Sequence, residues 1–184
     1  MRILAVGGFG SGSGKTTLVA LLLARLPGWG ALKTSPGKHG RPPTGPWTLE
    51  TDARALRAAG SDTARMIDAG AARVAWLRSA GTPPQDALDA VRRWSAGLPG
   101  LVVEGLRAAE ALGADRLYLV ARAGSRDLKP AAVEAASRAD AIVVNGTAPP
   151  AGLPSGRIVV ADLAKIPGPS LEALLEEISA WSRK

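Results

Sequence analysis

Gly8-Phe9-Gly10-Ser11-Gly12-Ser13-Gly14-Lys15-Thr16-Thr17 is the most informative segment of this chain. The apolar run 3–6 before it predicts a strand, and residues 17–26 after it favour a helix that Pro27-Gly28 ends. Glycines let successive backbone N–H groups turn inward, a following helix directs its positive end at the same place, and Lys15 adds a positive charge. The segment therefore predicts a loop that binds phosphate groups.

The loop supplies most of the predicted nucleotide contacts. We expect these contacts from Gly12, Ser13, Gly14, Lys15, Thr16 and Thr17, with Lys15 also serving catalysis. The Thr16 hydroxyl is expected to bind Mg²⁺, because Mg²⁺ prefers octahedral oxygen ligands and bridges protein and phosphate oxygens. The alternative, a flexible Gly/Ser linker, is disfavoured because linkers are not bracketed by an apolar strand and an apolar helix.

The loop departs from the usual pattern G-x-x-x-x-G-K-[ST] at its first position, where Phe9 replaces glycine. We therefore expect an altered first turn, with Gly8 or Gly10 supplying the tight bend that Phe9 cannot. The segment 11–17 is intact, so phosphate binding is predicted to survive the change.

Length and composition set broad bounds. The 184 residues suit a single domain spanning 1–184, and the absence of cysteine excludes disulfides and thiolate metal sites. No apolar stretch approaches the roughly 20 residues of a membrane span, and Met1-Arg2 runs straight into the first predicted strand, so we expect a cytoplasmic protein without a membrane partner. The net charge of +7 comes from dispersed, mostly arginine residues, and with one Tyr and one Phe it favours a solvated basic surface over a specific nucleic-acid site.

Short apolar runs alternate with helical stretches along the whole chain. Strands are predicted at 3–6, 30–33, 73–77, 101–103, 116–120, 141–144 and 157–160. Thr82 is expected to cap a helix that carries Leu88, Val91 and Trp94, and Ser170 to begin the last helix. Together with the phosphate loop, this alternation predicts an α/β fold of three layers, the P-loop NTPase fold, with a mostly parallel central sheet and ligands at the carboxyl ends of its strands.

Two charged residues close predicted strands. Glu104 follows the strand 101–103, where its carboxylate can hold Mg²⁺ or orient an attacking water; a helix cap or an ion pair is the alternative. Lys33 ends the second strand and can contact a phosphate or an acidic substrate, or simply lie exposed. We therefore predict catalytic and metal-binding roles for Glu104 and a substrate contact for Lys33.

Four further polar features have competing interpretations. Asp52 and Asp62 flank a predicted helix at 52–59; either can reach Mg²⁺, but helix caps are favoured. The proline- and glycine-rich stretch 35–47 predicts a loop, either a lid or ordinary surface, and its His39 is more simply a loop residue than a general base. Asn145 can read a purine edge or form a turn. The guanine-reading pattern Asn-Lys-x-Asp is incomplete, because Ala148 stands at its carboxylate position, so GTP and ATP both remain open.

With these residues in place, the chain resembles the molybdopterin-guanine dinucleotide biosynthesis protein B (MobB) family over Arg2 to Arg122. The matching segments are Ser11 to Leu18, Ala31 to Lys33, Ser61 to Arg65 with Ala69 to Ala71, and Val102 to Leu106. The resemblance implies a GTP-binding, weakly hydrolysing accessory protein, often a homodimer, that assists the molybdopterin nucleotidyltransferase. It implies that Lys15 and Thr16 serve the phosphates and Mg²⁺, with Glu104 in the magnesium environment. The chain lacks the histidines that family members place directly after the second-strand lysine.

Two other classes of function fit the same loop. An ATP-dependent small-molecule kinase or a dethiobiotin-synthetase-like ligase would use Lys33 and the 35–47 loop to hold an acceptor, and Asn145 to read adenine. A basic ATPase associated with nucleic acid is the third hypothesis, with less support from composition.

Overall fold

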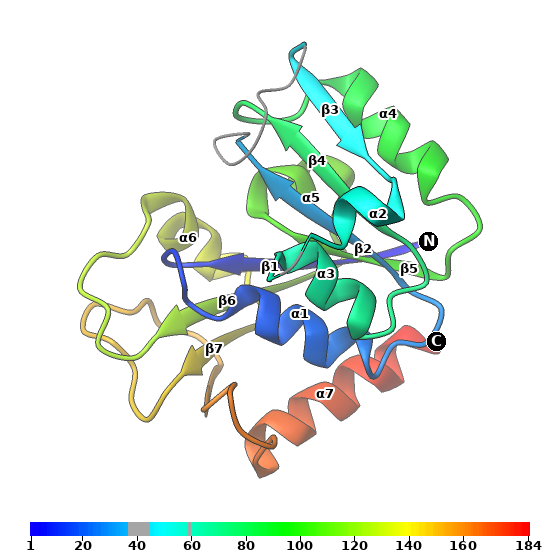
Figure 1. The fold of residues 1–184 in the computed structure, drawn as a ribbon. Helices are drawn as coiled ribbons and strands as arrows, with labels where there is room; N and C mark the ends of the chain where they lie inside the picture. The colour runs from blue at the N-terminus through cyan, green and yellow to red at the C-terminus, as the bar shows by residue number, and fades with distance from the viewer. Residues whose placement is uncertain (37–44, 59) are drawn as a thin grey trace.

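Eight strands form one sheet in the order β3-β4-β2-β5-β1-β6-β7-β8, within the residues 1–36, 45–58 and 60–184 that the computed structural model describes (Figure 1). The strands are β1 (Arg2–Gly8), β2 (Gly30–Ser35), β3 (Trp47–Glu50), β4 (Val74–Ser79), β5 (Gly100–Glu104), β6 (Arg116–Arg122), β7 (Ala141–Asn145) and β8 (Ile158–Ala161). Only β3 runs antiparallel to its neighbour. The predicted α/β class with a mostly parallel sheet is confirmed.

All seven predicted strands are present, and the sequence analysis missed β3. This strand has only four residues at the edge of the sheet, and it begins at Trp47, where the predicted loop was expected to end. Residues 37–44, which include His39, lie outside the described residues, so the predictions for that stretch stay predictions.

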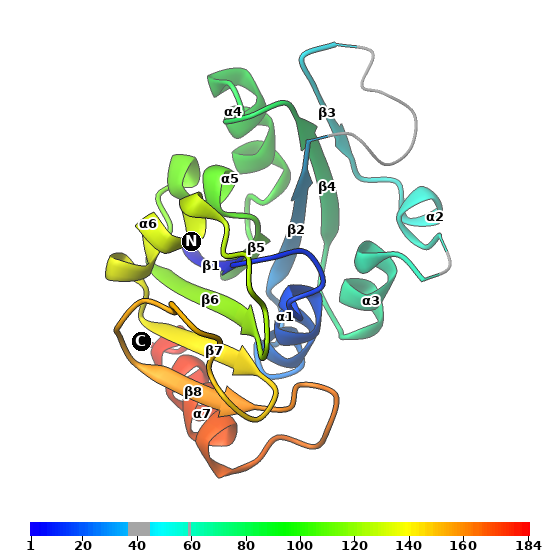
Figure 2. The ribbon, with the colours of Figure 1, turned by 90° about the vertical axis from the view of Figure 1, so that its left-hand side faces the viewer.

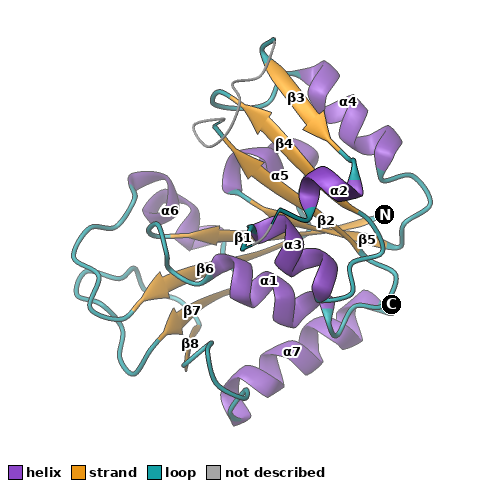
Figure 3. Ribbon diagram, in the orientation of Figure 1, coloured by secondary structure: helices purple, strands orange, loops and turns teal. Residues whose placement is uncertain are grey.

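Helices cover both faces of the sheet. They are α1 (Lys15–Leu23), α2 (Ala53–Leu56), α3 (Asp62–Asp68), α4 (Gln85–Trp94), α5 (Leu106–Leu112), α6 (Pro130–Ala135) and α7 (Pro169–Ser182), with a 3₁₀ turn at Ala136–Arg138. Helices α1, α3 and α7 pack on one face and α4, α5 and α6 on the other (Figures 2 and 3). The result is the predicted three-layer arrangement.

The central strand β1 shows how the sequence produces these layers. Its side chains alternate between the faces, as in any strand: Leu4 and Val6 pack with α1 and α7, whereas Ile3 and Ala5 pack with α4 and α5. All four are buried because both faces are covered. Coverage of both faces therefore explains why this buried parallel strand has a continuous apolar run in the sequence.

Two predicted helix starts were wrong. Helix α4 begins at Gln85 with Pro84 in the cap position, and α7 begins at Pro169 with Gly168 as its cap. A residue that precedes proline is disfavoured from helical backbone, so Pro83 does not follow a Thr82 cap as the first helical residue. Pro84 is extended, with ψ of 164°, and the helix begins at Gln85. Proline also suits the first helical position, since its N–H is missing there at no cost, and this moves the start of α7 ahead of Ser170.

The topology places β1 in the middle of the sheet, between β5 and β6. The loop that follows β1 therefore emerges at the centre of the carboxyl edge, with the ends of β5 and β2 beside it. Within the described ranges, no helix is long and apolar enough to cross a membrane.

Candidate functional site

The loop between β1 and α1 turns at Gly12 and Gly14, whose φ angles are +66° and +106°. These angles lie in the left-handed region that favours glycine. Of the two glycines expected to supply the tight bend, Gly8 does not, because it is the last residue of β1, whereas Gly10 does lie in a bend of the chain. Gly8 leaves space for the loop: a Cβ there would lie 2.6 Å from Ser13 Oγ and 2.8 Å from Lys15 Cδ, so these side chains would have to shift. The loop therefore folds back over the end of β1.

Phe9 anchors the start of this loop. Its N–H donates to the Val120 carbonyl at 3.0 Å, and its carbonyl accepts from the Lys129 N–H at 2.8 Å. Its ring is 1% exposed among apolar residues of β6, β7 and α6. The aromatic residue at the first loop position thus points into the core, away from the concave side of the loop.

Three oxygen-bearing side chains meet at the first turn of α1. The Thr16 Oγ1 atom lies 2.8 Å from Asp62 Oδ1 and 2.9 Å from Glu104 Oε2. A hydroxyl donates one hydrogen at a time, so it bonds to only one of these two carboxylates in any instant. Glu104 is 2% exposed. The cluster is a compact set of hard oxygen donors beside the loop.

Lys33 holds the two carboxylates of this cluster together. Its Nζ lies 2.5 Å from Asp62 Oδ2 and 2.5 Å from Glu104 Oε1. Burial disfavours the ammonium charge, but the attraction and hydrogen bonds of Glu104 and Asp62 outweigh burial and raise the pKa of Lys33. Burial likewise opposes the charge of Asp62, yet its contacts with Lys33 and Thr16 lower the pKa of that carboxyl. Lys33 and Asp62 are therefore both charged at neutral pH.

Lys15 curls over the loop from the first turn of α1. Its Nζ donates to the Gly10 carbonyl at 3.2 Å. Burial is the largest influence on this group and, with the nearby Lys33 and Lys129, it lowers the pKa of Lys15 despite the opposing pull of Glu104 and Asp62. A partly desolvated ammonium of this kind gains from a bound anion.

Two further contacts fix the outer side of the loop. The Asn145 Nδ2 group, at the end of β7, donates to the Ser13 carbonyl at 3.2 Å, and its Oδ1 accepts from the Leu163 N–H at 3.1 Å. On the other side, Arg65 Nη2 of α3 donates to Thr17 Oγ1 at 2.9 Å. Asn145 therefore braces the loop, and its predicted contact with a base stays a prediction.

These groups line a cavity of about 750 Å³. Residues 11–17 form one wall, the start of α3 with Asp62 and Arg65 forms another, and Lys33 and Glu104 lie between them. The volume lies within the range of small-molecule and cofactor sites. The cavity combines the backbone of the glycine-rich loop, three lysines and two carboxylates, a set of groups that suits a polyphosphate with a divalent cation.

Known structures share this fold. The MobB protein homolog from Bacillus stearothermophilus matches with a TM-score of 0.51 and 19% identity, covering 100% of this chain and 99% of its own. LpxK from Aquifex aeolicus, solved in complex with ATP, matches with a TM-score of 0.51 and 20% identity over 78% of this chain and 48% of its own. No protein-family model matches the sequence, and no curated protein matches it. The chain has a P-loop NTPase fold.

The P-loop site brings together most of the residues that the sequence analysis singled out. Lys15, Thr16, Lys33 and Glu104 all line one cavity. Asp62 joins them: the cap of α3 is Ser61, and the favoured capping role of Asp62 was wrong. Asp52 does cap α2, accepting from the Ala55 N–H at 2.8 Å.

Arg65 and Lys129 also line the P-loop cavity, and the sequence analysis assigned them no role. Arg65 lies one helical turn after Ser61. Residues three or four positions apart share a side of a helix, so the sequence could have indicated that Arg65 lies near the site. Lys129 follows an irregular loop and has no such signal. Only the packing of that loop on Phe9 brings it to the site.

Proposed function

We propose that this chain binds a purine nucleotide with Mg²⁺ at the P-loop and acts as a GTP-binding, slowly hydrolysing accessory protein in the biosynthesis of the molybdenum cofactor. The observation that carries the nucleotide site is that the Thr16 hydroxyl lies within 2.9 Å of both the Asp62 and the Glu104 carboxylates, at the end of the glycine-rich loop. The finer assignment to cofactor biosynthesis is supported by the likeness to the MobB homolog along the whole chain.

The residues present fit Mg²⁺. The hydroxyl of Thr16 and the carboxylates of Asp62 and Glu104 would hold it, because Mg²⁺ prefers oxygen ligands and usually takes only one or two carboxylates, with phosphate oxygens and water completing its shell. Among the described residues, no group of three or more His, Cys, Asp or Glu side chains could hold a metal ion alone. The cation would neutralise charge that develops on the phosphates.

The remaining residues have separable roles in this proposal. Lys15 binds the terminal phosphates, and the backbone amides of residues 12–17 bind their oxygens. Glu104 orients the attacking water, or holds it through Mg²⁺. Hydrolysis is slow because the described cavity lining contains no glutamine that could orient water, and its one arginine, Arg65, is bonded to Thr17.

Binding by fluorescent GTP and ATP analogues with Mg²⁺ tests the proposal directly. GTP preference with slow phosphate release supports an accessory protein, whereas clear ATP selectivity, or turnover of many molecules per second without added substrate, contradicts it. The matched control is Lys15→Ala, which retains the fold and loses the phosphate contact. Pull-down of a purified molybdopterin nucleotidyltransferase and the mass of the chain in solution test the predicted partner and the predicted homodimer.

An ATP-dependent small-molecule kinase or ligase is the second candidate. It is favoured by a second cavity that shares Lys15 with the first, and by the fold that the chain shares with the ATP complex of LpxK. The two candidates separate by base preference and by the response of turnover to an acceptor.

A further inference from the structure

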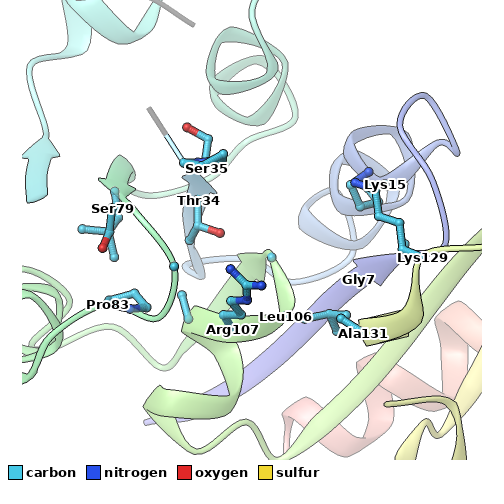
Figure 4. A pocket seen from close by; sticks show the side chains of 16 residues that line it. Gly7, Lys15, Thr34, Ser35, Ser79, Pro83, Leu106, Arg107, Lys129 and Ala131 are labelled. Atoms are coloured by element: carbon cyan, nitrogen blue, oxygen red, sulfur yellow. The ribbon is translucent and has the colours of Figure 1, made fainter. Parts of the chain in front are cut away.

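A second cavity of about 340 Å³ adjoins the P-loop cavity on the side of α4 and α5. Ser79 at the end of β4, Arg107 in the first turn of α5, and Lys129 ahead of α6 all line it (Figure 4). Lys15, Thr34, Ser35, Pro36 and Lys129 line both cavities. The two spaces are therefore neighbours that share a wall, and that wall contains the phosphate-binding lysine.

The charge of the second cavity is of one sign. Its described lining includes Lys15, Arg107 and Lys129 and no Asp or Glu, whereas the P-loop cavity contains Asp62 and Glu104 beside its lysines. In Figure 4 the guanidinium of Arg107 extends from α5 toward Thr34. When a nucleotide phosphate engages Lys15, two cations remain to favour an anion in this cavity.

Ser79 supplies an independent indication of a ligand. Its side chain is buried, with 7% of the residue exposed, and its Oγ has no hydrogen-bond partner in the structure. Buried hydroxyl groups are almost always hydrogen-bonded, because an unsatisfied donor costs about 1–3 kcal/mol. The other two hydroxyls of this wall are engaged: Thr34 Oγ1 donates to the Glu104 carbonyl, and Ser35 Oγ accepts from Trp76 Nε1. Ser79 is thus a buried hydroxyl in the wall of the cavity without a protein partner.

We propose that the second cavity binds a small organic anion that carries a phosphate or carboxylate group, next to the terminal phosphate of the bound nucleotide. Arg107 and Lys129 pair with the anionic group and Ser79 donates a hydrogen bond to it. The apolar walls at Leu77, Pro83 and Leu106 pack against its carbon skeleton. The inference rests on the proposed function only in that a nucleotide fills the adjoining cavity.

The experiment first saturates the protein with Mg²⁺ and a GTP analogue that has an imido group between its β- and γ-phosphates, so that the P-loop holds no vacant phosphate position. Phenylphosphonate is then titrated and its ³¹P signal is followed. We expect the signal to broaden in a saturable way. The affinity for phenylphosphonate should fall by about 10-fold in Arg107→Ala and by about 3-fold in Ser79→Ala, since charge-assisted hydrogen bonds are stronger than neutral ones. The control Arg93→Ala, an exposed arginine of α4 that lines neither cavity, should bind as the wild type does.

A phosphonate signal that stays unchanged up to millimolar concentrations overturns the inference, as does equal broadening in Arg107→Ala and the wild type. Failure of the GTP and ATP analogues to bind is a separate result, which would contradict the proposed function and not this inference. The melting temperature of Ser79→Ala gives a second readout. Because its hydroxyl has no protein partner and an unsatisfied buried donor is costly, this variant should be at least as stable as the wild type, and a large loss of stability would assign Ser79 a structural bond.

Discussion

Replacing Lys33 with methionine should destabilise the protein because it leaves two carboxylates facing each other without a cation. The Lys33 ammonium lies 2.5 Å from both Asp62 and Glu104. Its side chain is 16% exposed, and that of Glu104 only 2%. Methionine retains most of the volume of lysine, so the loss reports charge and hydrogen bonding rather than a cavity.

The two halves of this ion triad contribute unequally. Removing one partner of a buried ion pair costs about 3–5 kcal/mol, whereas an exposed pair contributes about 0–1 kcal/mol. The Asp62 side chain is 43% exposed, so water compensates much of its charge, and Glu104 carries most of the effect. We expect a loss of about 3 kcal/mol at the lower end of the buried range, which corresponds to a fall of roughly 6–12 °C in melting temperature for a chain of this size.

Thermal and urea denaturation measure this loss, with Lys165→Met as the matched control. Lys165 pairs with Asp162 at the surface and is 78% exposed, so its replacement should change stability by less than about 0.5 kcal/mol. In a Glu104→Gln background, Lys33→Met should cost far less, because the uncompensated charge is gone. A loss below about 1 kcal/mol in the single variant would refute the reasoning.

Magnesium gives the same variant a second test. If Thr16, Asp62 and Glu104 form a cation site, Mg²⁺ should stabilise Lys33→Met more than it stabilises the wild type, since the metal can take the place of the missing ammonium. A ligand at a concentration 100-fold above its dissociation constant raises the free energy of unfolding by about 2.7 kcal/mol. Equal Mg²⁺ responses in the two proteins would contradict the assignment of these oxygens to a metal.

Four further measurements follow from the site. Lys15→Ala should lower the affinity for fluorescent GTP by about 100-fold, because a charge-assisted contact with phosphate is lost; a loss below about 3-fold contradicts its role. Glu104→Gln should spare binding and slow phosphate release by about 100-fold, and unchanged turnover would remove its proposed function. The lowered pKa of Asp62 means that its ionised form stabilises the fold above the unfolded pKa of 3.8 and that this stability disappears as the pH falls through the folded pKa. The stability difference between the wild type and Asp62→Asn should therefore narrow in acid, and a constant gap would contradict the pairing with Lys33. Asn145→Ala should weaken GTP, GDP and pyrophosphate alike if Asn145 braces the loop, whereas selective loss of base preference would support its predicted contact with the purine.

The fold was predictable because its signals are local. A strand, a glycine-rich turn and a helix stand together in the first 26 residues, and the apolar runs that follow have the length of buried parallel strands. The missed strand β3 has no such signal: four half-buried residues at an edge alternate too briefly to be distinguished from a loop. Edge strands that pair on one side need little apolar surface, and their sequences reflect this.

The site was predictable only where the chemistry follows a strand. Glu104 and Lys33 close neighbouring strands, so the topology rule that places carboxyl ends at one edge brings them together. Asp62 lies at the start of a helix, where a capping role explains an aspartate equally well. The choice between the two roles depended on how α3 docks on α1, which is a matter of tertiary packing. Tertiary packing also explains why the sequence could not predict that both the Nδ2 and the Oδ1 of Asn145 form hydrogen bonds within the chain.

Phe9 shows that the first position of a P-loop does not have to be glycine when the backbone turns elsewhere in the loop. Glycine is common at the first position of a P-loop because it allows the sharp turn that many chains make there. Phe9 does not make such a turn: like every other described non-glycine residue of this chain, it has no positive φ. Here the turn is made later, at Gly12 and Gly14, and the first position continues the hydrogen bonding of β1 to β6 through the Phe9 amide. The Cβ of that residue then faces the core, where a large side chain adds apolar burial. Phe9→Gly should accordingly lower the melting temperature while leaving the conformation of residues 11–17 intact. Loss of nucleotide affinity without loss of stability would show that the ring shapes the loop instead.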